Sequence, residues 1–259
     1  MNRRRALGQH FLRDPGVARA IVDLVAPGAQ DLVVEIGPGE GALTAELARR
    51  AGPVRALEID RALAARLRER FPEVEILDAD ARDWDYSALR APAGGRVLVA
   101  GNLPYSVGTK ILISLVRAHG AIDEMALMLQ REVAERVAAQ PGGKAYASLS
   151  IFCQLHWDVR IAFRVPPGAF RPPPEVESAV LHLKSLPQPR VALADERRFE
   201  TVVRAAFAQR RKTLANALAS GLGLRADDVR VATEAAGIDS RRRAETLAIW
   251  EFAKIAARL

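Results

Sequence analysis

Short apolar segments alternate with amphipathic segments along the first half of the chain. The apolar segments predict strands, which are expected at residues 32–36, 54–59, 74–77, 96–101 and 125–129. The amphipathic segments predict helices, which are expected at residues 42–50, 61–71 and 110–118. An earlier helix begins at Asp14-Pro15, a cap followed by proline, and runs to about Ala26. Strands that alternate with helices are typical of a doubly wound α/β fold with a parallel sheet.

The pattern changes after residue 158. Residues 159–165 and 176–184 are extended runs, and the proline-rich connection at 166–174 excludes a helix between them. We therefore expect an antiparallel pair that closes the sheet, which gives seven strands with one of them antiparallel.

A proline-rich linker at residues 186–190 precedes a segment that contains only helical patterns. Apolar residues recur there at helical spacing, and further helices are expected at 211–220, 226–236 and 243–258, with Gly237 as a C-terminal cap. The pattern predicts two domains, residues 1–186 and a small all-helical domain at 191–259.

The composition excludes several classes of protein. Of the 259 residues 49% are hydrophobic and 27% charged, which is typical of a globular chain. No apolar run approaches the roughly 20 residues that span a bilayer, and Gly8-Gln9-His10 interrupts any signal peptide. One cysteine, Cys153, excludes an internal disulfide framework, and the four histidines lack metal-ligand spacing. We expect a cytoplasmic protein without a metal.

The chain is basic, with a net charge of +7 and an isoelectric point near 10.1. An arginine-rich composition would explain this charge, but a polyanionic partner would also explain it. Three basic triplets favour a localised patch: Arg3-Arg4-Arg5, Arg210-Arg211-Lys212 and Arg241-Arg242-Arg243. Two of them lie in the last quarter of the chain.

A glycine-rich segment, residues 35–42 with the sequence EIGPGEGA, follows the first predicted strand. Glycines at this place let the backbone approach a ligand closely. Glu58 ends the second strand about 20 residues later, where a carboxylate accepts hydrogen bonds from ribose hydroxyls. Gly37-x-Gly39-x-x-Ala42 also satisfies the dinucleotide fingerprint, so NAD stays an alternative.

Three features favour S-adenosylmethionine over NAD. Glu35 places a carboxylate where it suits a methionine ammonium group and repels a pyrophosphate. Asp80 follows the third strand, where it suits an adenine amine, although a loop residue or helix cap would explain it equally well. The glycine segment itself contains no arginine to meet a phosphate.

Asn102-Leu103-Pro104-Tyr105 follows the fourth predicted strand. Pro104 lacks an N–H group and biases Leu103 toward an extended conformation. An amide carbonyl beside an aromatic ring suits an exocyclic base amine on a stacked base. The simpler interpretation is a strand-to-helix turn with a half-buried tyrosine.

With these motifs assembled, the chain closely resembles the KsgA family of ribosomal RNA adenine dimethyltransferases, and it is similar to the related Erm enzymes and mitochondrial transcription factor B. The resemblance covers almost the whole chain. It rests on the ordered motifs LGQHFL (7–12), VEIGPG (34–39), LEID (57–60), NLPY (102–105), QREV (130–133), FRPPPEV (170–176) and FAQRRKTL (207–214). His10 departs from the family, which usually has asparagine there.

The resemblance implies a Rossmann-like class I methyltransferase sheet with a small helical C-terminal domain. It implies that S-adenosylmethionine is the cofactor, in a site lined by His10, Leu12, Gly37, Glu58, Asp80 and Asn102, to which we add Gly39 from the glycine motif. The implied substrate is small-subunit (16S) rRNA, in the subunit or its precursor, where two adjacent adenines near the 3′ end are each methylated twice.

The expected partner is therefore the small ribosomal subunit during its biogenesis, bound by a monomer whose Arg210, Arg211 and Lys212 hold rRNA phosphates. Two alternatives remain open. An Erm-like enzyme would methylate large-subunit rRNA, and a ribosome-assembly or transcription factor would keep the fold without the chemistry.

The chemistry of the amine suggests roles for the tetrapeptide. The adenine N6 lone pair is delocalised into the ring, so the Asn102 side-chain carbonyl and the Leu103 main-chain carbonyl are expected to accept its N–H bonds and localise the lone pair. Tyr105 is expected to stack on the base. Phe170 is a candidate for the opposite face, or else an anchor of the proline-rich turn.

Overall fold

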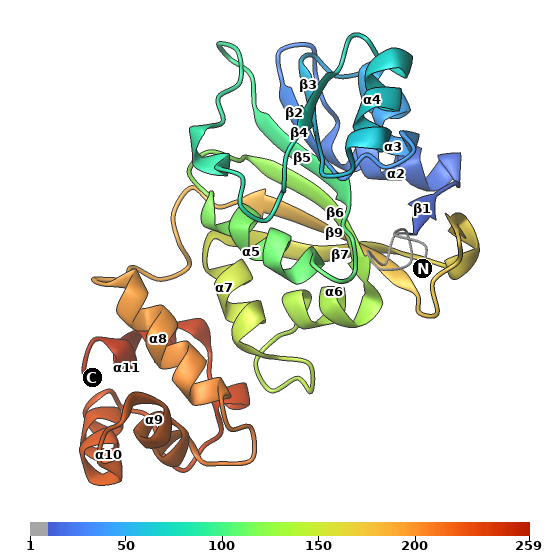
Figure 1. The fold of residues 1–259 in the computed structure, drawn as a ribbon. Coiled ribbons are helices and arrows are strands. Elements are labelled where there is room, and N and C mark those ends of the chain that lie inside the picture. The colour runs from blue at the N-terminus through green and yellow to red at the C-terminus, as the bar shows by residue number, and fades with distance from the viewer. Residues whose placement is uncertain (1–9) are drawn as a thin grey trace. The chain divides into compact units, whose positions relative to one another are not determined.

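The computed structural model describes residues 10–259, which form two compact units (Figure 1). Unit 1 contains the described residues up to Ala134 and Asp158–Ser185, and unit 2 contains Glu135–Trp157 and Leu186–Leu259. Residues 135–157 thus cluster with the C-terminal helices, although the sequence pattern groups them with the N-terminal domain. The functional division into 1–186 and 191–259 stays a prediction.

Unit 1 is built on a seven-stranded sheet with the order β4-β3-β2-β5-β6-β9-β7. The strands are β2 (Leu32–Ile36), β3 (Val54–Glu58), β4 (Glu75–Asp78), β5 (Val97–Asn102), β6 (Glu124–Gln130), β7 (Trp157–Val165) and β9 (Ser178–Ser185). The pairs among β2 to β6 are parallel, and β9 is antiparallel to β6. The predicted fold class is confirmed.

A separate two-stranded sheet joins the beginning of the described chain to the proline-rich connection. Its strands are β1 (Phe11–Leu12) and β8 (Phe170–Arg171), which pair antiparallel. Neither strand has the length or alternation that a sequence pattern reveals, so the pattern predicts neither of them. The connection holds no α-helix, as predicted, but it forms one 3-10 turn, η2 (Pro167–Ala169).

The α-helices are α2 (Pro15–Val25), α3 (Ala42–Ala48), α4 (Arg61–Arg70), α5 (Gly108–Arg117), α6 (Arg131–Ala138), α7 (Ser148–His156), α8 (Glu196–Phe207), α9 (Leu214–Leu222), α10 (Ala226–Ala235) and α11 (Ile249–Ala256). Two further 3-10 turns are η1 (Tyr86–Ala88) and η3 (Ala244–Thr246). The sequence pattern does not predict α6 and α7. α6 follows β6 with no turn residue between them, which removes the usual boundary signal.

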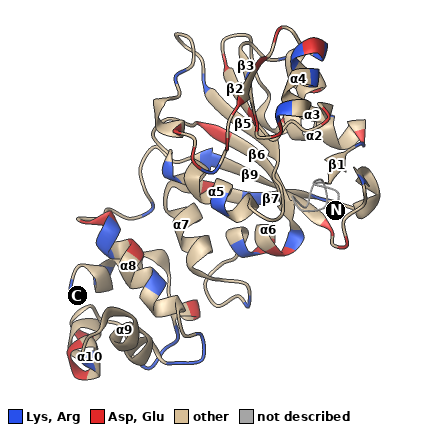
Figure 2. Cartoon of the chain, viewed as in Figure 1, with Lys and Arg blue, Asp and Glu red and all other residues tan. Residues whose placement is uncertain are grey.

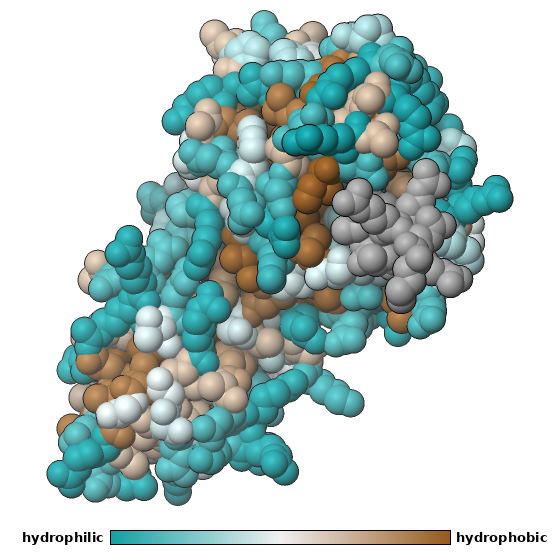
Figure 3. Space-filling view, viewed as in Figure 1, coloured by the Kyte–Doolittle hydropathy of each residue, from teal (hydrophilic) through white to brown (hydrophobic). Residues whose placement is uncertain are grey.

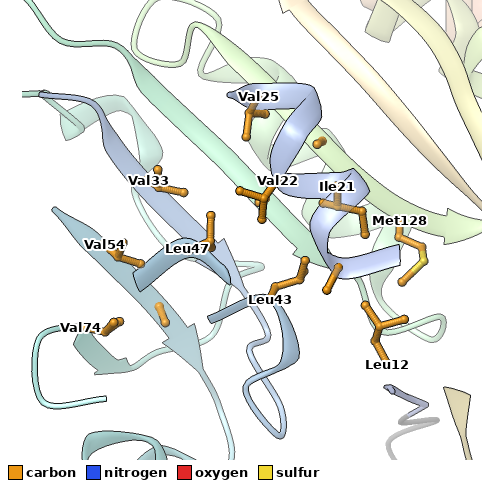
Figure 4. Close-up of a cluster of buried hydrophobic side chains, with 14 of the residues drawn as sticks. Leu12, Ile21, Val22, Val25, Val33, Leu43, Leu47, Val54, Val74 and Met128 are labelled. Atoms are coloured by element: carbon orange, nitrogen blue, oxygen red, sulfur yellow. The ribbon is translucent and has the colours of Figure 1, made fainter. Parts of the chain in front are cut away.

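Helices cover both faces of the sheet, and the central strands β2, β5 and β6 are therefore buried along nearly their whole length. On one face, α2, α3 and α4 pack against the strands, and Ile21, Val22 and Val25 of α2 point toward the sheet (Figure 4). α5 lies on the other face (Figure 1). The predicted start of α2 is confirmed, because the Asp14 carboxylate accepts hydrogen bonds from the N–H groups of Gly16 (2.7 Å) and Val17.

Unit 2 has its own core around Phe199, Leu214, Leu218 and Phe252, all of them fully buried. Two predicted helices are wrong in their extent. The helix expected at 211–220 begins only at Leu214, and the one expected at 243–258 is divided into η3 and α11 by two extended residues, Leu247 and Ala248. Leu247 is itself fully buried in this core, so tertiary packing overrides the helical spacing.

Candidate active site

The carboxyl ends of β2, β3 and β5 surround a pocket of about 160 Å³. This edge of an open parallel sheet, where the strand order reverses, is the usual place for a nucleotide ligand. The lining includes eight of the residues that the sequence singles out: His10, Gly37, Gly39, Glu58, Asp80, Asn102, Leu103 and Tyr105. Segments far apart in the chain thus converge on one site.

The glycine segment between β2 and α3 lines one side of this pocket. Gly39 has φ +60°, and a Cβ atom at this position would lie 2.9 Å from the Phe11 ring. Only glycine allows both this backbone conformation and the close packing of β1 on the loop.

Glu58, the last residue of β3, fixes the conformation of the glycine loop. Its Oε2 accepts a hydrogen bond from the Gly39 N–H at 3.1 Å, and its Oε1 accepts one from the Asp60 N–H at 2.9 Å. Burial raises the pKa of Glu58, while these two hydrogen bonds favour the charged form. A carboxylate has about four lone-pair positions, so Glu58 retains acceptor capacity for hydroxyl groups in the pocket.

Glu35 is fully buried directly below the loop. Neither of its carboxyl oxygens has a hydrogen-bond partner among the described residues, and they adjoin a cavity of about 20 Å³. Burial raises the pKa of Glu35 to about 8, and the charge of Glu58 adds to this effect. A buried carboxyl group without a partner is rare and suits a cationic ligand group.

Asp80 lies in the loop after β4, where it lines the pocket. The Arg82 guanidinium donates to both of its oxygens, with Nε at 3.0 Å from each, and the Arg82 N–H donates at 2.9 Å. The Arg82 side chain accordingly holds the pKa of Asp80 below its usual range. Asp80 therefore stays charged as an acceptor, oriented by a neighbour two residues away.

Asn102 ends β5, and its side-chain orientation is determined by one contact. Its Nδ2 donates a hydrogen bond to the main-chain carbonyl of His10 at 2.9 Å. Because a carbonyl only accepts, the amide NH₂ must face His10, and Oδ1 is left as an acceptor. No described residue donates to Asn102 Oδ1 or to the Leu103 carbonyl, so the two acceptors are both available at the pocket.

Tyr105 is half-buried at the other end of the tetrapeptide, and contacts from two distant segments hold it. Its hydroxyl is 2.5 Å from Oγ of Ser178, the first residue of β9. Ser178 is fully buried. The His10 ring lies 5.3 Å from the Tyr105 ring between centroids, tilted by 36°. His10 Nδ1 in turn donates to the Pro172 carbonyl at 2.9 Å. The tyrosine ring is thus fixed at the pocket wall.

Two predicted site residues lie elsewhere. Leu12 pairs with Phe170 across β1 and β8, and both side chains belong to the hydrophobic core, with exposed fractions of 5% and 4%. Neither lines the pocket. The anchoring role proposed for Phe170 accounts for its position, whereas stacking on a base would require the ring to leave the core and stays a prediction. The same holds for Leu12 as a direct cofactor contact.

The predicted RNA-binding triplet Arg210-Arg211-Lys212 is exposed in unit 2. It occupies the turn between α8 and α9, where Figure 2 shows basic residues, and not a helix as expected. Backbone hydrogen bonds from Leu214 to Arg242 and from Ala215 to Ser240 bring the 239–243 loop beside it. Arg242 is engaged with Glu251, however, and Arg241 with Asp239. The third triplet, Arg3-Arg4-Arg5, lies outside the described residues.

Sequence reasoning missed several residues of the pocket wall. Ile59 is 54% exposed, an unusual state for a large apolar side chain, and it follows Glu58 directly at the pocket. Ile111 of α5 and Arg82 also contribute to the wall. Their position in the sequence is the available signal, because a residue that directly follows a ligand-binding strand end lies at the same binding site.

Figure 3 shows that most of the visible surface of unit 1 is hydrophilic.

A family model described as ribosomal RNA adenine dimethylase matches residues 1–259. The chain belongs to this family. Curated relatives in the ribosomal RNA adenine dimethylase family include proteins named ribosomal RNA small subunit methyltransferase A. The one from Magnetococcus marinus is 47% identical over 255 residues (97% of this chain and 90% of that protein), and the one from Moorella thermoacetica is 45% identical over 266 residues (99% and 92%).

Solved structures share the fold. A dimethyladenosine transferase from Plasmodium falciparum superposes with a TM-score of 0.79 at 22% identity, covering 95% of this chain and 96% of that one. The 23S rRNA methyltransferase ErmE superposes with a TM-score of 0.71 at 26% identity, covering 96% and 99%. Among residues 10–259, no helix combines the length and the apolar character needed to cross a membrane.

His10 stands where the resemblance described above leads us to expect asparagine. The contact with Asn102 uses the main-chain carbonyl of His10, which any residue supplies. The side chain adds the contact with Pro172 and the ring beside Tyr105. The substitution therefore preserves the orientation of Asn102.

Proposed function

We propose that this protein transfers methyl groups from S-adenosylmethionine to N6 of two adjacent adenosines near the 3′ end of small-subunit rRNA, and so acts in small-subunit biogenesis. One observation carries the proposal. Asn102 Oδ1 and the Leu103 carbonyl are adjacent acceptors without donors among the described residues, and the Tyr105 ring stands beside them in the same pocket.

The residues on the side of the pocket that contains the glycine loop fit S-adenosylmethionine. The unpartnered Glu35 carboxyl suits the methionine ammonium, Glu58 has spare acceptor capacity for ribose hydroxyls, and Asp80 suits the adenine amine. Gly37 and Gly39 allow close approach of the backbone, and the His10 segment borders the pocket. When bound, the cofactor supplies an electrophilic methyl group on a sulfonium.

Asn102 and Leu103 make the N6 amine of the substrate adenine a better nucleophile. Two carbonyl oxygens that accept its N–H bonds favour a pyramidal nitrogen with a localised lone pair, a geometry needed only in the transition state. The nitrogen then becomes cationic and loses its proton readily. No described residue of the pocket is therefore required as a strong base, and positioning supplies much of the acceleration.

Tyr105 holds the base in place. Ring stacking contributes about 1–3 kcal/mol per base, and the Ser178 hydroxyl fixes the direction of the ring. A base enters such a pocket only after it leaves its own stack. The pocket thus suits an adenine that is extruded from structured RNA.

The curated relatives support the small subunit as the substrate, since they carry that subunit in their names at 47% and 45% identity, whereas the large-subunit enzyme ErmE is 26% identical. Arg210, Arg211 and Lys212 are exposed and would neutralise rRNA phosphates. We place the protein in the cytoplasm as a monomer that binds the subunit or its precursor.

The test is methyl transfer to defined ribosomal particles. Small subunits that lack the modification should gain label from labelled S-adenosylmethionine on two adjacent adenines, and fully modified subunits should not. Label on large subunits would indicate the Erm-like alternative. No label on either particle, with binding intact, would indicate an assembly factor. A thermal melting shift with S-adenosylmethionine and none with NAD would exclude the dehydrogenase interpretation.

A further inference from the structure

A second hollow of unit 1 lies on the outer side of the glycine loop. It measures about 430 Å³, which is larger than the main pocket. One wall is formed by Leu12 of β1 and the following Arg13, the floor by Gly39 to Ala42, and the other wall by α4. Gly39 lines both hollows, so the two adjoin across the loop. We call the second hollow the arginine groove.

Three guanidinium groups face the arginine groove from its two walls. Arg66 and Arg70 are four residues apart on α4 and therefore lie on one face of the helix, while Arg13 comes from the opposite wall. All three side chains are exposed, and Figure 2 shows basic residues on α4. The glycine segment contains no arginine of its own, yet the fold brings three to its outer side.

The arginine groove carries excess positive charge. Arg13 pairs with Glu40 at 2.7 Å, which neutralises one guanidinium. Arg66 donates only to the Ala62 carbonyl within its own helix at 3.4 Å, and Arg70 donates to the Glu40 main-chain carbonyl at 3.1 Å and covers the Phe71 ring. Neither pairs with a carboxylate among residues 10–259.

Arg70 lies in the last turn of α4, where the helix dipole favours a cation. Arg66 lies one turn earlier, and like charges four residues apart repel each other. Both guanidinium groups are therefore available to an anionic ligand, since neither has a carboxylate partner among the described residues. Planar guanidinium forks on both sides of a groove match the oxygens of a phosphodiester.

We propose that the arginine groove binds the phosphate backbone of the RNA strand whose adenine enters the adjoining pocket. The inference rests on the proposed function, because it takes that strand to be the substrate. The groove would hold nucleotides beside the target, through contacts that position the strand without reading its sequence. Unit 1 would then bind the substrate directly, in addition to the basic turn of unit 2.

The test measures binding without turnover. The full-length double variant Arg66→Gln/Arg70→Gln is compared with wild type for binding a labelled fragment of unmodified small-subunit rRNA over a range of KCl concentrations. We expect the variant to bind about tenfold more weakly or worse at low salt. The slope of log K against log [KCl] should fall by about two, because each of the two arginines neutralises one phosphate in the wild type.

The matched control removes the same charge elsewhere. Arg19→Gln/Arg61→Gln changes two exposed helical arginines of unit 1 that line neither hollow. It should keep nearly the wild-type affinity and slope, and both variants should keep the wild-type affinity for S-adenosylmethionine.

An equal loss in the control would mean that net charge alone is responsible and would overturn the proposal. So would an unchanged affinity in the groove variant, or a wild-type protein that does not bind the RNA. A wild type that binds the fragment but transfers no methyl group would contradict the proposed function, while the groove would still be judged by the two variants.

Discussion

The two sides of the pocket differ in charge. The side built from β3 and the loop after β4 carries the carboxyl groups of Glu58 and Asp80, and Glu35 of β2 lines the small cavity that shares Gly37 and Gly39 with this side. The side built from β5 presents neutral acceptors, the Asn102 amide and the Leu103 carbonyl, next to Tyr105. Carboxylates suit a cationic cofactor that must be held, whereas neutral carbonyls suit an amine that must stay unprotonated until it reacts. We call the first the acidic side and the second the neutral side. The contrast assigns cofactor binding to the acidic side and the chemistry to the neutral side.

The two sides also differ in how they are assembled. Glu58 contacts Asp60, two positions away, and Gly39, 19 positions away, and Asp80 is oriented by Arg82, two positions away. Asn102 is oriented by a residue 92 positions away, and Tyr105 by one 73 positions away. The acidic side is therefore assembled from the ends of neighbouring strands, while the neutral side depends on much more distant segments of unit 1.

The largest expected effect is on the neutral side. Asn102→Ala removes one acceptor that acts in the transition state, so kcat should fall by about 10² to 10³. Affinity for S-adenosylmethionine, measured by calorimetry, should fall much less. If both quantities fall by the same factor, Asn102 is mainly a cofactor ligand and the division between the two sides is wrong.

The second prediction concerns Glu35 and stability. Its ordinary pKa is 4.5 and burial raises it to about 8 in the folded protein, so the unfolded chain releases this proton first as pH rises. The neutral carboxyl stabilises the fold fully below pH 4.5, and this contribution is lost progressively up to about pH 8. The loss is at most about 1.4 kcal/mol per pH unit.

Glu35→Gln, which cannot ionise, should match wild type near pH 4.5 and exceed its Tm by about 5 °C or more at pH 8 without cofactor. S-adenosylmethionine should reverse the order, because its ammonium favours the charged carboxyl of wild type. A Tm difference that is independent of pH and of cofactor would show that Glu35 does not serve the acidic side in this way.

The sequence predicts the acidic side well and the neutral side only in part. Strand ends follow from apolar runs, so the sequence alone places Glu35, Glu58 and Asp80 at one edge of the sheet. It also places Asn102 and Tyr105 there, but it does not predict the contacts that orient them. Hydrophobic spacing carries no information about which distant segment returns to a site.

The same limit applies to two further residues or segments. Phe170 stays a candidate stacking residue, but the sequence does not predict its burial, because β1 and β8 are two residues each and their pairing leaves no periodic signal. The Arg210-Arg211-Lys212 triplet is expected in a helix because its composition is compatible with one, but α9 begins only at the buried Leu214. Tertiary packing decides both cases.

Glu58 on the acidic side is expected to affect cofactor affinity more than turnover. Glu58→Gln keeps the size of the side chain but gives up a charged acceptor to the ribose hydroxyls and to the Gly39 N–H. Hydrogen bonds to a charged group contribute about 1.5–3 kcal/mol, so the Kd for S-adenosylmethionine should rise by about 10-fold to 100-fold. With saturating cofactor, kcat should stay within a few-fold of wild type. A large loss of kcat under saturation would place part of the chemistry on this side.

The smallest effect is expected at Ser178, which touches Tyr105 and does not line the pocket. Ser178→Ala removes the bond that fixes the phenol, worth about 1 kcal/mol, so the KM for the small subunit should rise by about five-fold while cofactor affinity stays unchanged. Tyr105→Phe removes the same bond from the other end and keeps the stacking ring. The two changes together should therefore cost no more than either alone.

Additive losses would show that Ser178 acts through the packing of β9 and not through the tyrosine. Ser178→Thr retains a hydroxyl, so a wild-type KM in this variant would locate the effect in the hydrogen bond itself.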